Sequence, residues 1–128
     1  MRSEVEAHIE KARRFLEGAL RDFSGGDYEG AVSRTYYTMF HCAKALLLTR
    51  GLYPKTHEGV LASFSRDFIK TGTLPREMGV HLMEAKRRRE KVDYVPLSTV
   101  TRDEAEDLIE RARAFLGHSR KHLHLTKH

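Results

Sequence analysis

The sequence predicts an all-α protein, an up-and-down antiparallel bundle of four long helices plus one short helix. Residues 27–51 are apolar around most of a helical circumference, so other helices must wrap this segment on most sides. The other long segments carry apolar residues at alternating spacings of three and four, the period of an amphipathic helix. No segment of reasonable length alternates with the period of two that a strand requires. We therefore expect residues 27–51 to form the central helix.

The central helix is expected to leave only a narrow polar stripe, formed by Arg34, Thr38 and His41. Tyr36 and Tyr37 fit two roles in this helix. They can be core aromatics whose hydroxyls reach polar partners, which we favour, or platforms on which bases stack. The single cysteine of the chain also lies in this helix, where it cannot form an internal disulfide and fits a small buried side chain.

Local signals bound the first two long helices. Ser3 and Glu6 have the spacing of a capping box, and a pair of glycines follows the last apolar residue of the same segment. Asp27 can cap the next helix, which a glycine followed by a proline ends. These signals predict helices over residues 3–24 and 27–50.

Three further helices follow along the chain. Thr56 can cap a short helix over residues 57–71, and Pro75 suits the first turn of a helix over residues 75–93. A second capping box opens a helix over residues 102–118. The connections are short, so helices that follow one another in the chain should be antiparallel neighbours.

Length and composition fit one domain. A chain of 128 residues can enclose one core and is too short for two ordinary domains. We expect a helical domain over residues 1–118 and a basic, histidine-containing tail over residues 119–128 that is poorly ordered. The longest apolar run is far below the roughly 20 residues that span a bilayer, and the N-terminus lacks the apolar centre of a signal peptide. These observations favour a cytoplasmic protein without a membrane partner.

Several kinds of site are absent from the sequence. It contains no glycine-rich phosphate loop, no HExxH and no CxxC. His118, His122 and His124 lie close together, but no carboxylate or cysteine accompanies them as a metal ligand. We therefore expect no metal and no cofactor. The formal net charge of +5 favours a polyanion or an acidic protein as a partner.

One charged residue interrupts an apolar stripe. In the helix over residues 75–93, Arg89 occupies a position where the spacing calls for an apolar side chain. An unpaired buried charge costs several kcal/mol, so the guanidinium must be paired, exposed or used on an anion. Asp93 follows one helical turn later, and Tyr94 comes next. Two interpretations stay open: a structural Arg89–Asp93 pair, or an anion or nucleotide site at an interface. Arg87 and Arg88 could extend the positive field in either case.

Three segments carry a resemblance to a known family. The central helix contains SRTYYTMFHCAKALL, the short helix contains THEGVLASFSRDF, and the fourth helix ends in RREKVDY. Together they resemble the HEPN (higher eukaryotes and prokaryotes nucleotide-binding) superfamily, especially its small stand-alone prokaryotic branch of toxin–antitoxin type. The resemblance implies a helical bundle that forms a homodimer, binds RNA or nucleotide, and acts with a minimal nucleotidyltransferase.

The resemblance also implies a catalytic motif that this sequence does not keep. Many relatives are metal-independent ribonucleases in which R-x(4-6)-H motifs from two protomers meet in the dimer cleft. Here no histidine follows Arg89 at that spacing, and Asp93 and Tyr94 lie there instead. His41 or His57 could supply an imidazole from another helix, although each also fits a structural role. The sequence therefore leaves RNA cleavage open, with Arg89, Asp93 and Tyr94 as the catalytic candidates.

Two classes of function follow. In the first, a HEPN-like dimer binds RNA or nucleotide: Arg89 contacts phosphate, Asp93 orients its guanidinium, and Tyr94 stacks on the nucleotide or hydrogen-bonds to it. The residues expected to bind RNA or nucleotide are Arg89, Tyr94, Arg88, Arg34 and His41. In the second class, the chain is a non-catalytic helical interaction module whose positive stripe docks an acidic partner protein.

Overall fold

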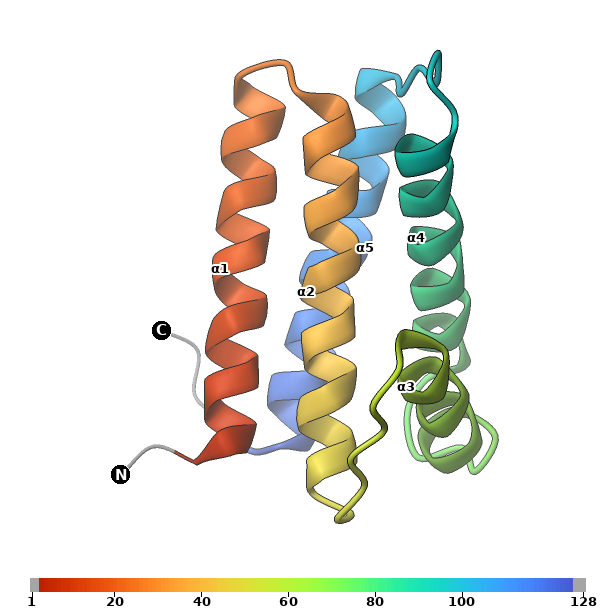
Figure 1. Ribbon diagram of the computed structural model, residues 1–128. Coiled ribbons are helices and arrows are strands. Elements are labelled where there is room, and N and C mark those ends of the chain that lie inside the picture. Colours follow the sequence, from red (N-terminus) through yellow and green to blue (C-terminus); the bar gives the residue numbers. More distant parts are fainter. Residues whose placement is uncertain (1–2, 126–128) are drawn as a thin grey trace.

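The computed structural model describes residues 3–125, and over these residues the chain forms five α-helices and no strand (Figure 1). Successive long helices run in opposite directions, so the predicted all-α, up-and-down antiparallel bundle is confirmed. The elements in chain order are α1 (Glu4–Ser24), α2 (Tyr28–Leu48), α3 (His57–Phe64), the π-helical turn η1 (Ser65–Ile69), α4 (Arg76–Tyr94) and α5 (Arg102–His122).

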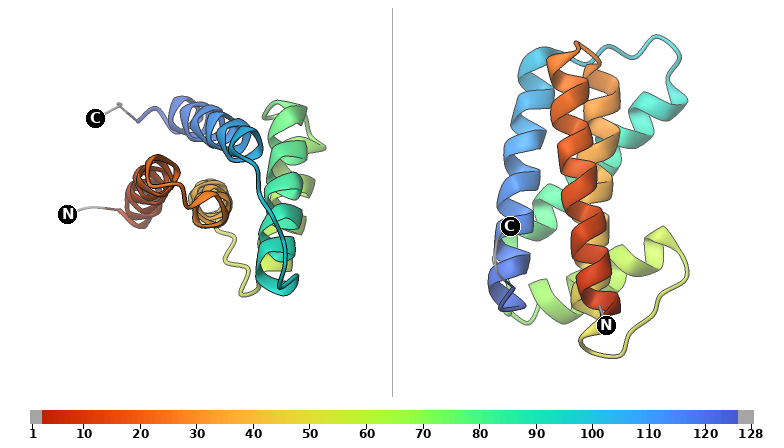
Figure 2. Two further views of the ribbon diagram at one scale, coloured as in Figure 1. Left: turned by 90° about the horizontal axis from the view of Figure 1, so that it is seen from above. Right: turned by 90° about the vertical axis from the view of Figure 1, so that its left-hand side faces the viewer.

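The α2 helix is the centre of the bundle, as predicted. It packs against α1, α3, α4 and α5, and its apolar side chains are almost completely enclosed. In the left-hand view of Figure 2, α5 lies on one side of the α1–α2 pair, and no helix covers the other side. We call this uncovered side of α1 and α2, together with the adjoining side of α4, the open face.

Only one stripe of α2 faces this open side. Arg34, Tyr37, His41 and Lys44 recur at spacings of three and four, and none of them is buried. Thr38, which was predicted to belong to this stripe, is instead fully buried, and its hydroxyl donates to the carbonyl oxygen of Arg34 at 3.0 Å. The reason is the helical step of about 100° per residue, which turns Thr38 toward the core and leaves Tyr37 between Arg34 and His41.

The predicted helix starts are present. The Ser3 hydroxyl accepts from the backbone N–H of Glu6 at 3.1 Å, which forms one half of a capping box with the Glu6 carboxylate. Asp27, Thr56 and Thr101 cap the starts of α2, α3 and α5 in the same manner. Each cap satisfies an N–H that the helix itself cannot pair, so each fixes where its helix begins.

Two helix ends differ from the prediction. The α5 helix continues to His122 rather than ending at residue 118, because Ser119 is buried and its hydroxyl donates to the carbonyl oxygen of Phe115 at 2.8 Å. The first residues of the expected tail are thus part of a packed helix, and residues 126–128 lie outside the described residues. The predicted helix over 57–71 is α3 followed by η1, a wider turn in which the N–H of Lys70 reaches the carbonyl oxygen of Ser65.

Within residues 3–125, the structure has no helix that is both long enough and apolar enough to cross a bilayer.

Candidate functional site

Arg89 projects from α4 onto two tyrosine rings of α2. Its guanidinium carbon lies 4.9 Å from the ring centre of Tyr36 and 5.6 Å from that of Tyr37. Nη1 donates to the Asp93 carboxylate at 2.9 Å and approaches the Tyr37 hydroxyl at 3.4 Å. The side chain is only 18% exposed, and Nε is buried without a hydrogen-bond partner. The guanidinium thus packs on aromatic rings at the position where an apolar side chain was expected.

His57, at the start of α3, joins this cluster through Tyr36. The Tyr36 hydroxyl and His57 Nδ1 are 2.9 Å apart, and the imidazole stacks on Phe40 with ring centres 4.2 Å apart. Burial raises the pKa of Tyr36 to about 12, so its hydroxyl keeps its proton at neutral pH. Burial, and then the positive charge of Arg89, lower the pKa of His57 and favour a neutral imidazole.

A second pair of imidazoles lies between α1 and α2. Nδ1 of His8 and Nδ1 of His41 are 3.0 Å apart, and Phe15 stacks on His41 with ring centres 5.6 Å apart. The pKa of His41 is lowered to about 4, first by burial and then by the neighbouring His8 and the ammonium groups of Lys11 and Lys44. Because both imidazoles are neutral near pH 7, one can donate to the other without repulsion.

Ring contacts connect the two ends of this arrangement across the open face. Phe15 stacks on Tyr37 at 5.3 Å, and Tyr37 lies under Arg89. We call the connected set the ring array; its members are His8, Phe15, Tyr36, Tyr37, Phe40, His41, His57 and Arg89, from α1, α2, α3 and α4.

Positive charges act on the ring array, and the carboxylates of Glu4, Glu58 and Glu90 act in the opposite sense at His8, His57 and Tyr36. The ammonium group of Lys44 lies 5.6 Å from the ring centre of Phe40, and its charge lowers the pKa of both His8 and His41. The charge of Lys11 acts on the same two imidazoles. Asp93 is the carboxylate bound to Arg89. Flat rings beside positive charges can accept a base on a ring face and a phosphate at a cation.

The structure brings together only some of the residues predicted for the site. Arg89 and Asp93 meet as predicted, and His41 belongs to the same ring array. Tyr94 is 77% exposed, and among the described residues its side chain makes neither a hydrogen bond nor a ring contact. One residue is a step of about 100° around the helix, so Tyr94 points away from the face that Asp93 shares with Arg89.

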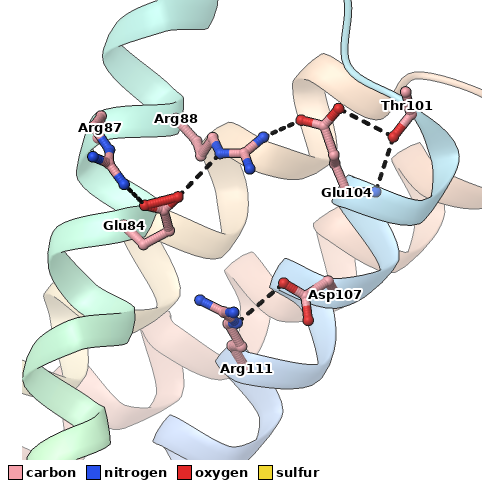
Figure 3. Close-up of polar contacts among 7 residues, drawn as sticks. All are labelled: Glu84, Arg87, Arg88, Thr101, Glu104, Asp107 and Arg111. Atoms are coloured by element: carbon pink, nitrogen blue, oxygen red, sulfur yellow. Dashed lines mark hydrogen bonds and ion pairs between the residues drawn. The ribbon is translucent and has the colours of Figure 1, made fainter.

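Arg88 and Arg34 have other partners. Arg88 lies on the side of α4 that faces α5, where Figure 3 shows its guanidinium between Glu84 and Glu104. There it links two helices rather than joining the ring array. Arg34 lies on the open face two turns before His41, and its Nε donates to the Asp22 carboxylate at 2.7 Å. Their predicted RNA contacts therefore stay predictions, and Arg34 alone of the two lies on the open face.

Sequence reasoning missed the contribution of α1. His8, Lys11 and Phe15 recur at spacings of three and four, so they share one face of α1 beside its apolar stripe. That pattern could have been read from the sequence as a second face. It could not have shown that this face meets His41 and Tyr37 of α2.

A hollow of about 740 Å³ lies elsewhere, between α4 and the α3–η1 segment. Its lining includes the exposed apolar side chains of Val80 and Met83 and does not include Arg89. Among residues 3–125, no three histidine, cysteine or acidic side chains are placed to hold a metal ion together.

Comparison with known proteins gives the family to which this helical chain belongs. The sequence profile of the HEPN domain matches residues 5–122. A protein of Methanocaldococcus jannaschii provisionally named a toxin is 42% identical over 120 residues, covering 94% of this chain and 82% of that protein. A second protein of that organism with the same provisional name is 38% identical over 123 residues, covering 96% and 91%. A UPF0332 protein of Thermotoga maritima is 35% identical over 112 residues, covering 88% and 85%.

The chain therefore belongs to the HEPN family. The match extends from the start of α1 to the end of α5, so it includes every helix that contributes to the ring array. This confirms the family that three short motifs had indicated.

The low pKa of His41 predicts a stability that depends on pH. An unfolded histidine titrates near 6.5, whereas folded His41 titrates near 4, so the unfolded chain binds more protons between these values. The free energy of unfolding should therefore fall as the pH is lowered from about 6.5 to about 4. His41→Phe should make this decline smaller, because a phenyl ring keeps the stacking and carries no proton. Urea unfolding at a series of pH values measures the effect.

A matched replacement, His118→Phe on the exposed side of α5, should leave the decline as in the wild type. An NMR titration that placed the His41 midpoint near 6.5 would contradict the buried, neutral imidazole.

Proposed function

We propose that this protein binds RNA through the ring array of its open face, as a toxin-like HEPN protein that acts with a minimal nucleotidyltransferase. The observation that carries the proposal is the Arg89 guanidinium, which lies on Tyr36 and Tyr37 and is steered by Asp93. A guanidinium is suited to phosphate because its planar donors match two phosphate oxygens. The rings beside it are suited to an unpaired base.

RNA accounts for the site better than an acidic protein does. An acidic surface would be attracted by the positive charge alone, and it would not require a continuous set of rings. The array places the rings of Tyr37 and His41 of α2 at 5.3 and 5.6 Å from the Phe15 ring of α1. The names of the two Methanocaldococcus relatives support a toxin-like role. The nucleotidyltransferase partner is part of the proposal on the strength of the family.

Cleavage of RNA is a second candidate function, which one contact favours. The R-x(4-6)-H histidine is missing after Arg89, and His57 is the imidazole that reaches the same tyrosine from another helix. The step requires the tautomer in which Nδ1 carries the proton and donates to the Tyr36 hydroxyl oxygen, because Nε2 would then accept the proton of a ribose 2′-hydroxyl. The 2′-oxygen would then attack phosphorus, and the 5′-oxygen would leave with a proton from water. The products would be a 2′,3′-cyclic phosphate and a 5′-hydroxyl.

The dimer of the proposal would form around the C-terminal end of α4. Tyr94, Val95 and Leu97 are exposed there, and Leu97 is 90% exposed. Large apolar side chains gathered at one exposed end are typical of a surface that another chain covers. A two-fold contact at this end would bring the Arg89 regions of two protomers toward one cleft.

The RNA-binding proposal is tested by two substitutions that keep charge or shape. Arg89→Lys replaces a planar fork by a point charge, and Asp93→Asn removes the charge that orients the fork. Arg89→Lys should weaken binding of a labelled RNA strand by about tenfold or more, because it loses one charge-assisted hydrogen bond of roughly 1.5–3 kcal/mol. Asp93→Asn should weaken binding less. Fluorescence anisotropy on samples of known melting temperature measures both.

Arg113→Lys, on the exposed surface of α5, serves as the control and should bind RNA like the wild type. If Arg89→Lys and Asp93→Asn lower the melting temperature and leave the RNA affinity unchanged, the pair is structural and the proposal is wrong.

The cleavage candidate is tested by His57→Gln in the presence of EDTA. Wild-type protein should convert labelled RNA to fragments with cyclic phosphate ends, and His57→Gln should lose this activity while it still binds RNA. Gel analysis of both end groups and of binding separates the two effects. If the RNA is still intact after prolonged incubation with the wild type, the protein is not a ribonuclease, and RNA binding alone remains the proposed function.

Self-association is tested by two substitutions, one at the exposed C-terminal end of α4 and one beside the hollow next to η1. Each places a charge in an exposed apolar region. Leu97→Glu should convert a dimer at tens of micromolar into a monomer, because it would bury a carboxylate in the contact. Val80→Glu lies beside the separate hollow next to η1 and should leave the dimer intact. Sedimentation equilibrium distinguishes the variants. The proposed contact at the C-terminal end of α4 is wrong if the wild type is only monomeric. It is also wrong if Val80→Glu, and not Leu97→Glu, abolishes the dimer.

A further inference from the structure

A groove of about 400 Å³ lies between α1 and α2 beside the ring array. Its lining includes four cations and one acid together with a phenyl ring: Lys11, Arg14, Arg21, Arg34, Glu10 and Phe15.

The cations form a row along the helix. Lys11, Arg14 and Arg21 are spaced by three and seven residues, so they lie on one face of α1 over a length of about 15 Å. Arg34 joins the row from α2 by crossing over Gly18. A Cβ atom at Gly18 would lie 2.9 Å from both Cδ and Nη1 of Arg34, so the glycine makes this close approach possible.

The acids next to the row already have arginine partners. The Glu10 carboxylate accepts from Nη2 of Arg13 at 2.7 Å and from Nε of Arg13 at 3.0 Å. Asp22 accepts from Arg34 at 2.7 Å. Arg14 lies 3.9 Å from Glu10, and its side chain is 75% exposed. The row therefore keeps a net positive charge that faces solvent.

The groove and the Arg89 region share side chains. Phe15 lines the groove and stacks on Tyr37 at 5.3 Å and on His41 at 5.6 Å. Tyr37 in turn lies under Arg89. A ligand on the α1 row would thus be adjacent to the ring array, and a strand long enough to follow the row could reach Arg89 across α2.

We infer that the substrate is a single RNA strand of several nucleotides, whose backbone phosphates follow the row on α1 while unpaired bases meet the ring array. This inference rests on the proposed function and adds the substrate class to it. A row of cations about 15 Å long matches a backbone rather than one phosphate. The rings of Phe15, Tyr37 and His41 are only partly buried, and a base can contact them only when it is not stacked in a duplex. A mononucleotide would use Arg89 and the rings and leave the row empty.

The experiment removes three cations of the row together, in the variant Lys11→Ala, Arg14→Ala, Arg21→Ala. Binding of a fluorescein-labelled ten-nucleotide oligouridylate is measured at several salt concentrations. We plot the logarithm of the binding constant against the logarithm of the salt concentration. The slope should decrease in magnitude by about 2, because each lost phosphate contact on a single strand lowers it by roughly 0.7.

The control removes the same charge elsewhere, in the variant Arg66→Ala, Lys70→Ala, Arg113→Ala, whose residues are exposed on η1, at its end and on α5. The control should keep the wild-type slope, and circular dichroism should show both variants folded.

The outcomes separate this inference from the proposed function. If the α1 variant has the slope of the control while Arg89→Lys still weakens binding, the row is not a backbone track and the proposed function stands. If the wild type does not bind the oligouridylate, both this inference and the proposed function are wrong. If a ten-residue polyglutamate displaces the RNA as well as unlabelled oligouridylate does, the groove is a general anion surface for an acidic protein, and the RNA assignment is wrong.

Discussion

The burial of α2 on every side but one is the constraint on which the rest of this structure depends. Four other helices contact it, so its side chains must be small or apolar wherever a neighbour lies. Charged and strongly polar side chains can keep part of their hydration only on the remaining stripe. Arg34, Tyr37, His41 and Lys44 occupy that stripe, and the helices beside it add their own rings and charges. The architecture of the core thus decides where a polar site can form.

The ring array also explains how a guanidinium is held close to the core. An arginine that is only 18% exposed loses much of its hydration, and a single carboxylate replaces only part of it. Here the faces of Tyr36 and Tyr37 carry partial negative charge beneath the cation, while Asp93 holds one end. The Nε atom stays without a partner. An arginine held this way is fixed in position, and in the proposed function the phosphate would meet the remaining donors of its guanidinium.

Some of the site could be read from the chain, because it depends on spacing within one helix. The Arg89–Asp93 pair is such a case, since residues four apart on a helix are neighbours. Tyr94 illustrates the limit, because the resemblance groups it with this pair whereas the helical rotation turns it to solvent. Thr38 is a similar case on α2. It was predicted to lie on the polar stripe with Arg34 and His41, but the helical rotation turns it into the core. The part played by α1 required knowing which helix packs on which.

The sequence by itself determined the all-α class, the helix starts and the family, because caps, apolar periods and short motifs are local properties of the chain. Only the tertiary structure decided which faces of α1, α2 and α4 meet. Contacts such as His8 with His41 and Phe15 with Tyr37 join residues on different helices. Their formation depends on how the helices rotate about their own axes in the bundle. That rotation is set by the packing of the whole core, which no local pattern encodes.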